Sequence, residues 1–161
     1  GFADMVGYTR LSRRLPEADL ARLVQRFEAV SADVVAACGG RLVKTVGDEV
    51  LFTTTTAEQA ADIALRLHAT HAEDDSVPEV RVGLATGQVL SRMGDVFGTT
   101  VNLASRLTAM AKPSGTLVDA ETRAHLDDDP RYVLRGQRGR PVRGFGVLRA
   151  YVLSRGSGVP D

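Results

Sequence analysis

The stretch RLVKTVGDEVLF, residues 41–52, contains two short apolar runs separated by the dipeptide Gly47-Asp48. Apolar runs on either side of a glycine-containing turn are typical of a β-hairpin. The same stretch carries Lys44, Asp48 and Glu49 among residues that have the pattern of a buried hairpin. A solvated turn has no need of a cation and two carboxylates here, whereas a phosphate-handling site does.

Helical and strand patterns alternate on both sides of this hairpin. The predicted order is strand 2–6, helix 10–38, strands 41–46 and 49–54, helix 56–74 and strand 79–92. This β-α-β-β-α-β order predicts an α+β fold with a ferredoxin-like core, in which the helices lie on one face of an antiparallel sheet. Further along, the patterns predict helices at 100–111 and 120–126, C-terminal strands at 115–120, 132–136 and 149–154, and a flexible glycine-rich turn region at 136–146.

Composition limits the class of protein. A chain of 161 residues with 43% hydrophobic and 25% charged residues suits one globular domain. The formal net charge is zero, so we expect no nucleic-acid partner. The single cysteine, Cys38, excludes an internal disulfide and favours a reducing, cytoplasmic location. No run approaches the roughly 20 apolar residues that a membrane-spanning helix needs.

The chain begins with what reads as the end of a strand, FADMV. We therefore expect a domain cut from a longer protein, with its N-terminal strand truncated, and an upstream regulatory region in a parent chain that could be membrane-anchored. The predicted domain covers residues 1–153, and residues 154–161 are expected to form a flexible tail.

Asp4 and Asp48 are candidate metal ligands. The topology places the end of the first strand beside the hairpin turn, which brings the two carboxylates together. Adjacent carboxylates repel each other, and a divalent cation relieves that repulsion. The alternative is structural, because Asp4 could cap the next helix and Asp48 could simply occupy a turn.

Two further segments carry polar groups suited to a nucleotide. Val6, Gly7, Tyr8 and Thr9 lead from a strand into a helix, where free backbone N–H groups can bind phosphate. Asn102 and Arg106 lie four residues apart on one helix face, and an amide with a guanidinium suits a sugar and a phosphate. Taken alone, the helix start is a weak signal, because Gly and Thr cap many helices, and an exposed polar stripe explains Asn102 and Arg106 better than a binding site does.

Together, FADMVGYT (2–9), KTVGDEVLF (44–52) and DVFGTTVNLASR (95–106) closely resemble the class III nucleotidyl cyclases in order and spacing. The resemblance extends from residue 2 to about residue 153 and implies an adenylyl cyclase catalytic domain. It implies that Asp4 and Asp48 bind two divalent cations, Mg²⁺ or Mn²⁺. It further implies that Lys44 and Asp95 read the purine, Asn102 orients the ribose and Arg106 stabilises the transition state.

Arg143 lies near the place where some members of that family have a lysine that holds the terminal phosphates, and we assign it that role. Guanylyl members typically carry glutamate and a small residue in place of Lys44 and Asp95. Adenine offers an N1 acceptor and an N6 donor, which a cation and an anion complement. The Lys44–Asp95 pair therefore favours ATP over GTP.

The resemblance implies a homodimer in which one subunit supplies Asp4 and Asp48 and the other supplies the remaining residues. Three alternatives are a guanylyl cyclase, a diguanylate cyclase, and an inactive cyclase-like module for dimerisation or nucleotide sensing. The diguanylate cyclase is considered because GDEVLF (47–52) superficially resembles the GGDEF loop of that family. Val46 stands where the GGDEF loop has its first glycine, which argues against the second alternative. Elsewhere we expect His68 and His71 on an exposed helix face and Met93 in packing contacts.

Overall fold

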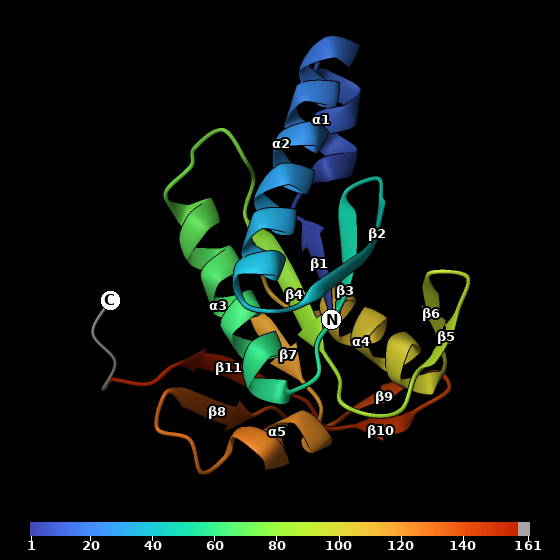
Figure 1. Cartoon of the computed structure of the whole chain (residues 1–161), viewed down its shortest axis with the longest axis vertical. Helices are drawn as coiled ribbons and strands as arrows, with labels where there is room; N and C mark the ends of the chain where they lie inside the picture. Colours follow the sequence, from blue (N-terminus) through green and yellow to red (C-terminus); the bar gives the residue numbers. More distant parts are fainter. Residues whose placement is uncertain (158–161) are drawn as a thin grey trace.

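The computed structural model describes residues 1–157 and contains one large sheet flanked by helices (Figure 1). The helices are α1 (Tyr8–Arg14), α2 (Glu17–Ala37), α3 (Ala57–Ala72), α4 (Thr99–Met110) and α5 (Ala120–Leu126). The strands are β1 (Phe2–Met5), β2 (Arg41–Val46), β3 (Glu49–Thr53), β4 (Val80–Leu84), β5 (Leu90–Arg92), β6 (Asp95–Phe97), β7 (Thr116–Val118), β8 (Tyr132–Gly136), β9 (Arg140–Val142), β10 (Gly146–Leu148) and β11 (Tyr151–Arg155).

The large sheet has the strand order β2-β3-β1-β4-β7-β11-β8. Its neighbours pair antiparallel, except that β4 and β7 are parallel. Two small hairpins, β5–β6 and β9–β10, lie outside this sheet. The order from β1 to β4 is the predicted β-α-β-β-α-β order, so the α+β, ferredoxin-like fold class is confirmed.

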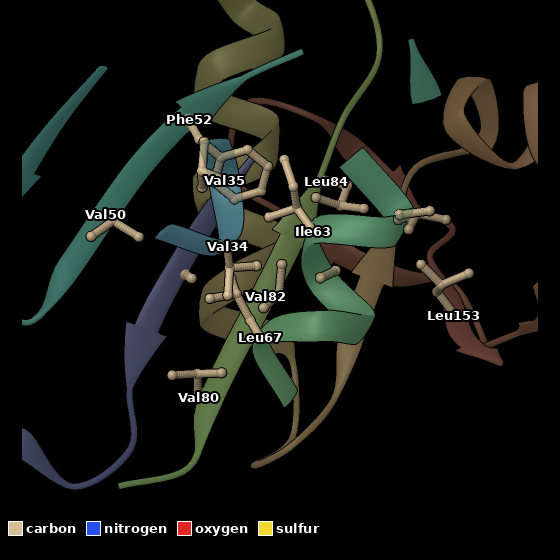
Figure 2. Close-up of a cluster of buried hydrophobic side chains, with 14 of the residues drawn as sticks. Val34, Val35, Val50, Phe52, Ile63, Leu67, Val80, Val82, Leu84 and Leu153 are labelled. Carbon is tan, nitrogen blue, oxygen red and sulfur yellow. The ribbon is translucent and has the colours of Figure 1, made fainter. Parts of the chain in front are cut away.

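The two long helices of this core, α2 and α3, cover one face of the sheet, as predicted. Figure 2 shows Val34 and Val35 of α2 and Ile63 and Leu67 of α3 packed over the sheet residues of the same cluster. Those sheet residues are Val50 and Phe52 of β3, Val80, Val82 and Leu84 of β4, and Leu153 of β11. Their alternation along each strand is what a half-buried sheet requires.

The opposite face of the sheet is covered by α4. The prediction that the helices lie on one face only was therefore incomplete. Ala104 and Leu107 of α4 pack with Phe2, Leu51 and Leu117, the alternate residues of their strands. Gly83 of β4 permits this contact, because a Cβ there would lie 2.3 Å from the backbone nitrogen of Thr108. The helix that carries Asn102 and Arg106 is thus held directly against the strand next to β1.

Three predicted elements differ from the structure. The helix expected at 10–38 is two helices, because Pro16 has no N–H to donate and begins a new helix as its N-cap. The strand expected at 79–92 ends at Leu84 and resumes as β5, across a segment that contains Gly87. The glycine-rich region 136–146, which was expected to be flexible, contains β9 and the turn of the β9–β10 hairpin.

The histidines of α3 were predicted to be exposed, and this was wrong. His71 is buried against Phe27 and its Nδ1 lies 3.0 Å from the carbonyl oxygen of Pro78. His68 is partly buried, and its Nε2 lies 2.8 Å from the hydroxyl of Thr116. His71 contacts the segment just before β4 and His68 contacts the first residue of β7, so both help to hold α3 on the sheet.

The end of the domain extends slightly past the predicted boundary. Ser154 and Arg155 belong to β11, and the N–H of Gly156 donates to the carbonyl oxygen of Arg131 at 2.8 Å. The rest of the predicted tail, residues 158–161, lies outside the described residues. Among residues 1–157, no helix has the length and apolar character needed to cross a membrane.

Candidate active site

The predicted metal ligands meet where β1 ends. Asp4 lies on β1 opposite Glu49 of β3, and the N–H of Met5 donates to the carbonyl oxygen of Asp48 at 2.9 Å. The side chain of Asp48 is close enough to that of Asp4 for its charge to act on the Asp4 carboxyl. Burial raises the pKa of Asp4, the contact with Arg81 opposes this, and the adjacent Asp48 adds to it.

Arg81 was not predicted as a site residue. It lies on β4 directly opposite Asp4, and its guanidinium contacts the Asp4 carboxylate. Its Nε is buried and has no hydrogen-bond partner among the described residues. The signal was available in the sequence, because Arg81 interrupts an otherwise apolar strand, VRVGL, that pairs with the strand of Asp4.

Negative charge is concentrated at this end of the sheet. Burial, and then the charges of Asp4 and Asp48, raise the pKa of Glu49. Within residues 1–157, no three acidic, histidine or cysteine side chains converge as a metal-binding group. Asp4 and Asp48 remain the predicted pair of carboxylate ligands. A pair of carboxylates fits Mg²⁺ or Mn²⁺, since such cations are commonly held by one or two carboxylates and by substrate phosphates.

The segment Val6–Thr9 connects Asp4 to the first helix. Gly7 is the N-cap of α1 with φ 77°, a left-handed conformation that favours glycine. The N–H groups of Arg10 and Leu11 donate to the carbonyl oxygen of Gly7, which turns the chain sharply after β1. The first N–H groups of a helix have no partner within it, and here they lie next to the carboxylate pair.

Lys44 and Asp95 are brought together as predicted. The Nζ of Lys44 lies 2.8 Å from Oδ2 of Asp95, and the two side chains are 44% and 29% exposed. The hydrogen bond from Lys44, and then one from the N–H of Val96, lower the pKa of Asp95. A bulge between Leu42 and Lys44 shifts the register of β2 beside this pair.

The β5–β6 hairpin that carries Asp95 has exposed apolar side chains. Leu90 is 72% exposed, Phe97 is 50% exposed, and Met93 is 96% exposed. The prediction that Met93 makes packing contacts was therefore wrong for the single chain. Met93 lies at the tip of the hairpin with a positive φ of 51°.

Asn102 and Arg106 lie one turn apart on α4, on the side away from its buried residues Ala104, Leu107 and Thr108. Both side chains are exposed, and neither has a hydrogen-bond or ion-pair partner among residues 1–157. Arg143 is also exposed and lies in the turn between β9 and β10. All three are therefore free to meet a ligand.

The predicted residues form two separate groups in one chain. Asp4, Asp48 and the segment Val6–Thr9 lie at the end of β1, whereas Lys44 and Asp95 join β2 to β6 next to α4. In the part of the chain that the structure describes, no hydrogen bond or ion pair connects the two groups. Within the described residues, the predicted site residues therefore do not form one connected cluster.

Comparisons with known proteins bear on this arrangement. Residues 1–155 match the family described as adenylate and guanylate cyclase catalytic domain. The chain belongs to this family. The resemblance to class III nucleotidyl cyclases is thereby confirmed. An adenylate cyclase of Glutamicibacter nicotianae is 51% identical over 98% of the cyclase domain, and one of Streptomyces coelicolor is 49% identical over the same share. The domain covers 39% and 48% of these relatives, so it spans less than half of their length.

Solved structures show the same fold. The adenylyl cyclase CyaB from P. aeruginosa is 26% identical to the cyclase domain, with a TM-score of 0.79 over 99% of this chain and 94% of that one. The catalytic core of a rhodopsin-guanylyl cyclase with converted specificity, in complex with ATPalphaS, has a TM-score of 0.87 over 96% of this chain and 93% of that one. At 22% identity, the second likeness concerns the fold alone.

Proposed function

We propose that this domain is an adenylyl cyclase, which converts ATP to 3′,5′-cyclic AMP and pyrophosphate by in-line attack of the ribose 3′-hydroxyl on the α-phosphorus. The ion pair between Lys44 and Asp95 carries the proposal, because it presents one cation and one anion together at a partly exposed position. Adenine needs such a pair at N1 and N6. The relatives named adenylate cyclase, at 51% and 49% identity, support the same substrate.

Asp4 and Asp48 would hold two divalent cations, Mg²⁺ or Mn²⁺. Bound there, the cations would lower the pKa of the 3′-hydroxyl and neutralise charge on the triphosphate. The two carboxylates are already adjacent, so they need little rearrangement to act as ligands. Arg81 holds Asp4 in place from β4 through the ion pair of its guanidinium with the Asp4 carboxylate.

The other residues would bind and orient ATP. The backbone N–H groups of Gly7, Tyr8 and Thr9 would contact phosphate oxygens next to Asp4. Val6, which was predicted to be part of this group, already donates its N–H to the carbonyl oxygen of Glu79 at 2.8 Å. Asn102 would orient the ribose, and Arg106, one turn further along α4, would neutralise the charge that develops on the α-phosphate. Arg143 would contact the terminal phosphates from the β9–β10 turn.

A homodimer would complete the site. In one chain the metal ligands and the purine pair are separate, and Asn102 and Arg106 have no partner among the described residues. In a twofold dimer, Asp4 and Asp48 of one subunit would face Lys44, Asp95, Asn102 and Arg106 of the other, which gives two equivalent sites. A cytoplasmic location and regulation by other regions of a longer parent chain belong to the same proposal.

Mixing two inactive variants tests the reaction and the shared site together. Asp48→Asn removes a metal ligand, and Arg106→Ala removes transition-state stabilisation; each should lower kcat by about 10²-fold or more. An equimolar mixture should recover about a quarter of wild-type activity, because half of the dimers are mixed and each has one intact site. The assay measures the cyclic AMP formed from ATP, and the cyclic GMP formed from GTP serves as the comparison.

The outcomes separate the alternatives. Recovery on mixing supports shared sites, whereas two inactive variants that stay inactive when mixed would contradict them. Preferential turnover of GTP would identify a guanylyl cyclase. Absence of product from the wild-type domain, with dimers demonstrated by sedimentation, would indicate a nucleotide-binding or dimerisation module.

A further inference from the structure

A polar cavity lies at the side of the sheet away from the proposed active site. It has a volume of about 450 Å³ and is lined by the end of α2, one side of α3, the start of β8 and the end of β11. In the large sheet, β8 is the edge strand opposite β2, which carries Lys44. The cavity therefore shares no residue with either group of active-site residues.

Three arginines line this cavity: Arg66 of α3, Arg131 just before β8, and Arg155 of β11. The charge of Arg131 is matched by Asp129 at 2.7 Å and by Asp62 at 3.6 Å, and its guanidinium lies 5.0 Å from the ring centre of Tyr132. These contacts hold Arg131 in one orientation at the cavity wall.

The other two guanidinium groups have no carboxylate partner among the described residues. Among residues 1–157, the one polar side-chain contact of Arg66 is with the neutral thiol of Cys38, at 3.9 Å, and burial raises the pKa of that thiol. Arg155 forms no ion pair within residues 1–157. Asp62 is the one acid that lines the cavity, and it already accepts a hydrogen bond from the hydroxyl of Tyr132 at 2.7 Å. The cavity thus has an excess of positive charge.

We infer that this cavity binds a small phosphorylated anion, with Arg66 and Arg155 as its main ligands. Two guanidinium groups from different elements can hold a phosphate through paired N–H donors, which single cations cannot do. The volume of about 450 Å³ is within the range of small-molecule sites, so a phosphate ester fits as well as the free ion. The inference does not depend on the proposed cyclase activity.

Cys38 provides the test, because it lies in the cavity wall and is the only cysteine of the chain. The rate of its alkylation by iodoacetamide should fall in a saturable way as inorganic phosphate is added in the presence of EDTA. At a phosphate concentration ten times its Kd, the rate should be about tenfold lower. AMP serves as the phosphate-ester probe, and tighter protection by AMP would identify an ester rather than the free ion.

Matched variants decide the result. Arg66→Gln with Arg155→Gln should abolish protection, whereas Arg135→Gln, which removes an exposed arginine of β8 outside the cavity, should leave it unchanged. Asp48→Asn should retain protection, which separates this site from the active site. Equal protection by chloride at matched ionic strength, protection that persists in the double variant, or no protection by either probe would overturn the inference.

Discussion

Lys44 and Asp95 satisfy each other in the free domain, and each remains partly exposed. An exposed ion pair contributes little to stability, so its place in the fold is better explained by ligand recognition. Adenine would accept from Lys44 and donate to Asp95 without leaving either charge unpaired. Guanine, with an acceptor at O6 and donors at N1 and N2, would meet the wrong partner at each position.

Replacing this pair with a glutamate and a small residue, as in guanylyl cyclases, should change the preferred base. In Lys44→Glu with Asp95→Ser, the ratio of kcat/KM for ATP to that for GTP should fall by at least about 10²-fold, since hydrogen-bonded sites discriminate strongly. The measurement is cyclic nucleotide formation from each substrate. Lys112→Glu, at the exposed second lysine of the chain, is the control and should leave the ratio unchanged. An unchanged ratio in the double variant would remove these residues from base recognition.

His68 should make the domain sensitive to acid. Burial, and then the nearby His71, lower the pKa of His68 from 6.5 to about 4. As the pH falls, His68 of the unfolded chain is protonated near pH 6.5, whereas His68 of the folded domain stays neutral until about pH 4. The free energy of unfolding is therefore unaffected by His68 above pH 6.5 and decreases as the pH falls from 6.5 toward 4. We expect the free energy of unfolding to drop by an amount on the order of 2 kcal/mol from this residue.

Urea denaturation at pH 7 and pH 4.5 measures this effect. His68→Gln keeps a donor that can reach Thr116 and removes the titrating group, so the drop in unfolding free energy should become smaller. His125→Gln, at an exposed histidine of α5, should leave it unchanged. A pH profile that His68→Gln does not alter would show that other groups cause the acid sensitivity.

At the scale of single elements, the position of α4 depends on Gly83. A Cβ at this residue would lie 2.3 Å from the backbone nitrogen of Thr108 and 2.4 Å from the carbonyl oxygen of Ala104. Because both neighbours are backbone atoms of α4, the helix itself would have to move. That movement would displace Asn102 and Arg106, which lie on the same helix.

Gly83→Ala should therefore lower both stability and activity. We expect a loss of about 1–3 kcal/mol in the free energy of unfolding, which is typical of overpacking, and a reduced kcat. Gly136→Ala in β8 is the matched control, because its Cβ would make only an ordinary 3.5 Å contact with Tyr151. Chemical denaturation and turnover of ATP measure the two effects. Unchanged stability in Gly83→Ala would mean that α4 can shift at no cost.

The elements that the sequence predicted well are those with strong local patterns. The core strands and the helices α2 and α3 have clear apolar periodicity. The resemblance to class III nucleotidyl cyclases led to Lys44 and Asp95, which the structure places 2.8 Å apart. The break at Pro16 and the end of β4 at Leu84 were missed because their apolar patterns continue past the break.

The remaining differences depend on tertiary contacts. His68 and His71 lie on a helix face that looks polar in sequence, yet the segment just before β4 and the first residue of β7 contact it. Arg81 becomes recognisable as a site residue only when β4 is known to lie beside β1. A single sequence does not state which strands are neighbours.

At the scale of the whole molecule, the exposed apolar residues suggest where a second copy would bind. Leu90 and Met93 belong to the hairpin that positions Asp95, and Val46 ends the strand of Lys44. Their exposed fractions are 72%, 96% and 61%, which is costly for side chains of this size in water. A dimer that shares its active sites would bury apolar surface close to the purine pair.

Leu90→Glu should therefore weaken dimerisation without changing the chemistry of the assembled site. Because a charge in an apolar interface must be desolvated, specific activity at low protein concentration should fall about tenfold or more and recover as the concentration rises. Ala69→Glu, at an exposed position of α3, should behave like the wild-type domain. Sedimentation velocity run beside the assay would show whether the dimer fraction follows activity. A loss of activity at every concentration, with dimers intact, would instead place Leu90 in ATP binding.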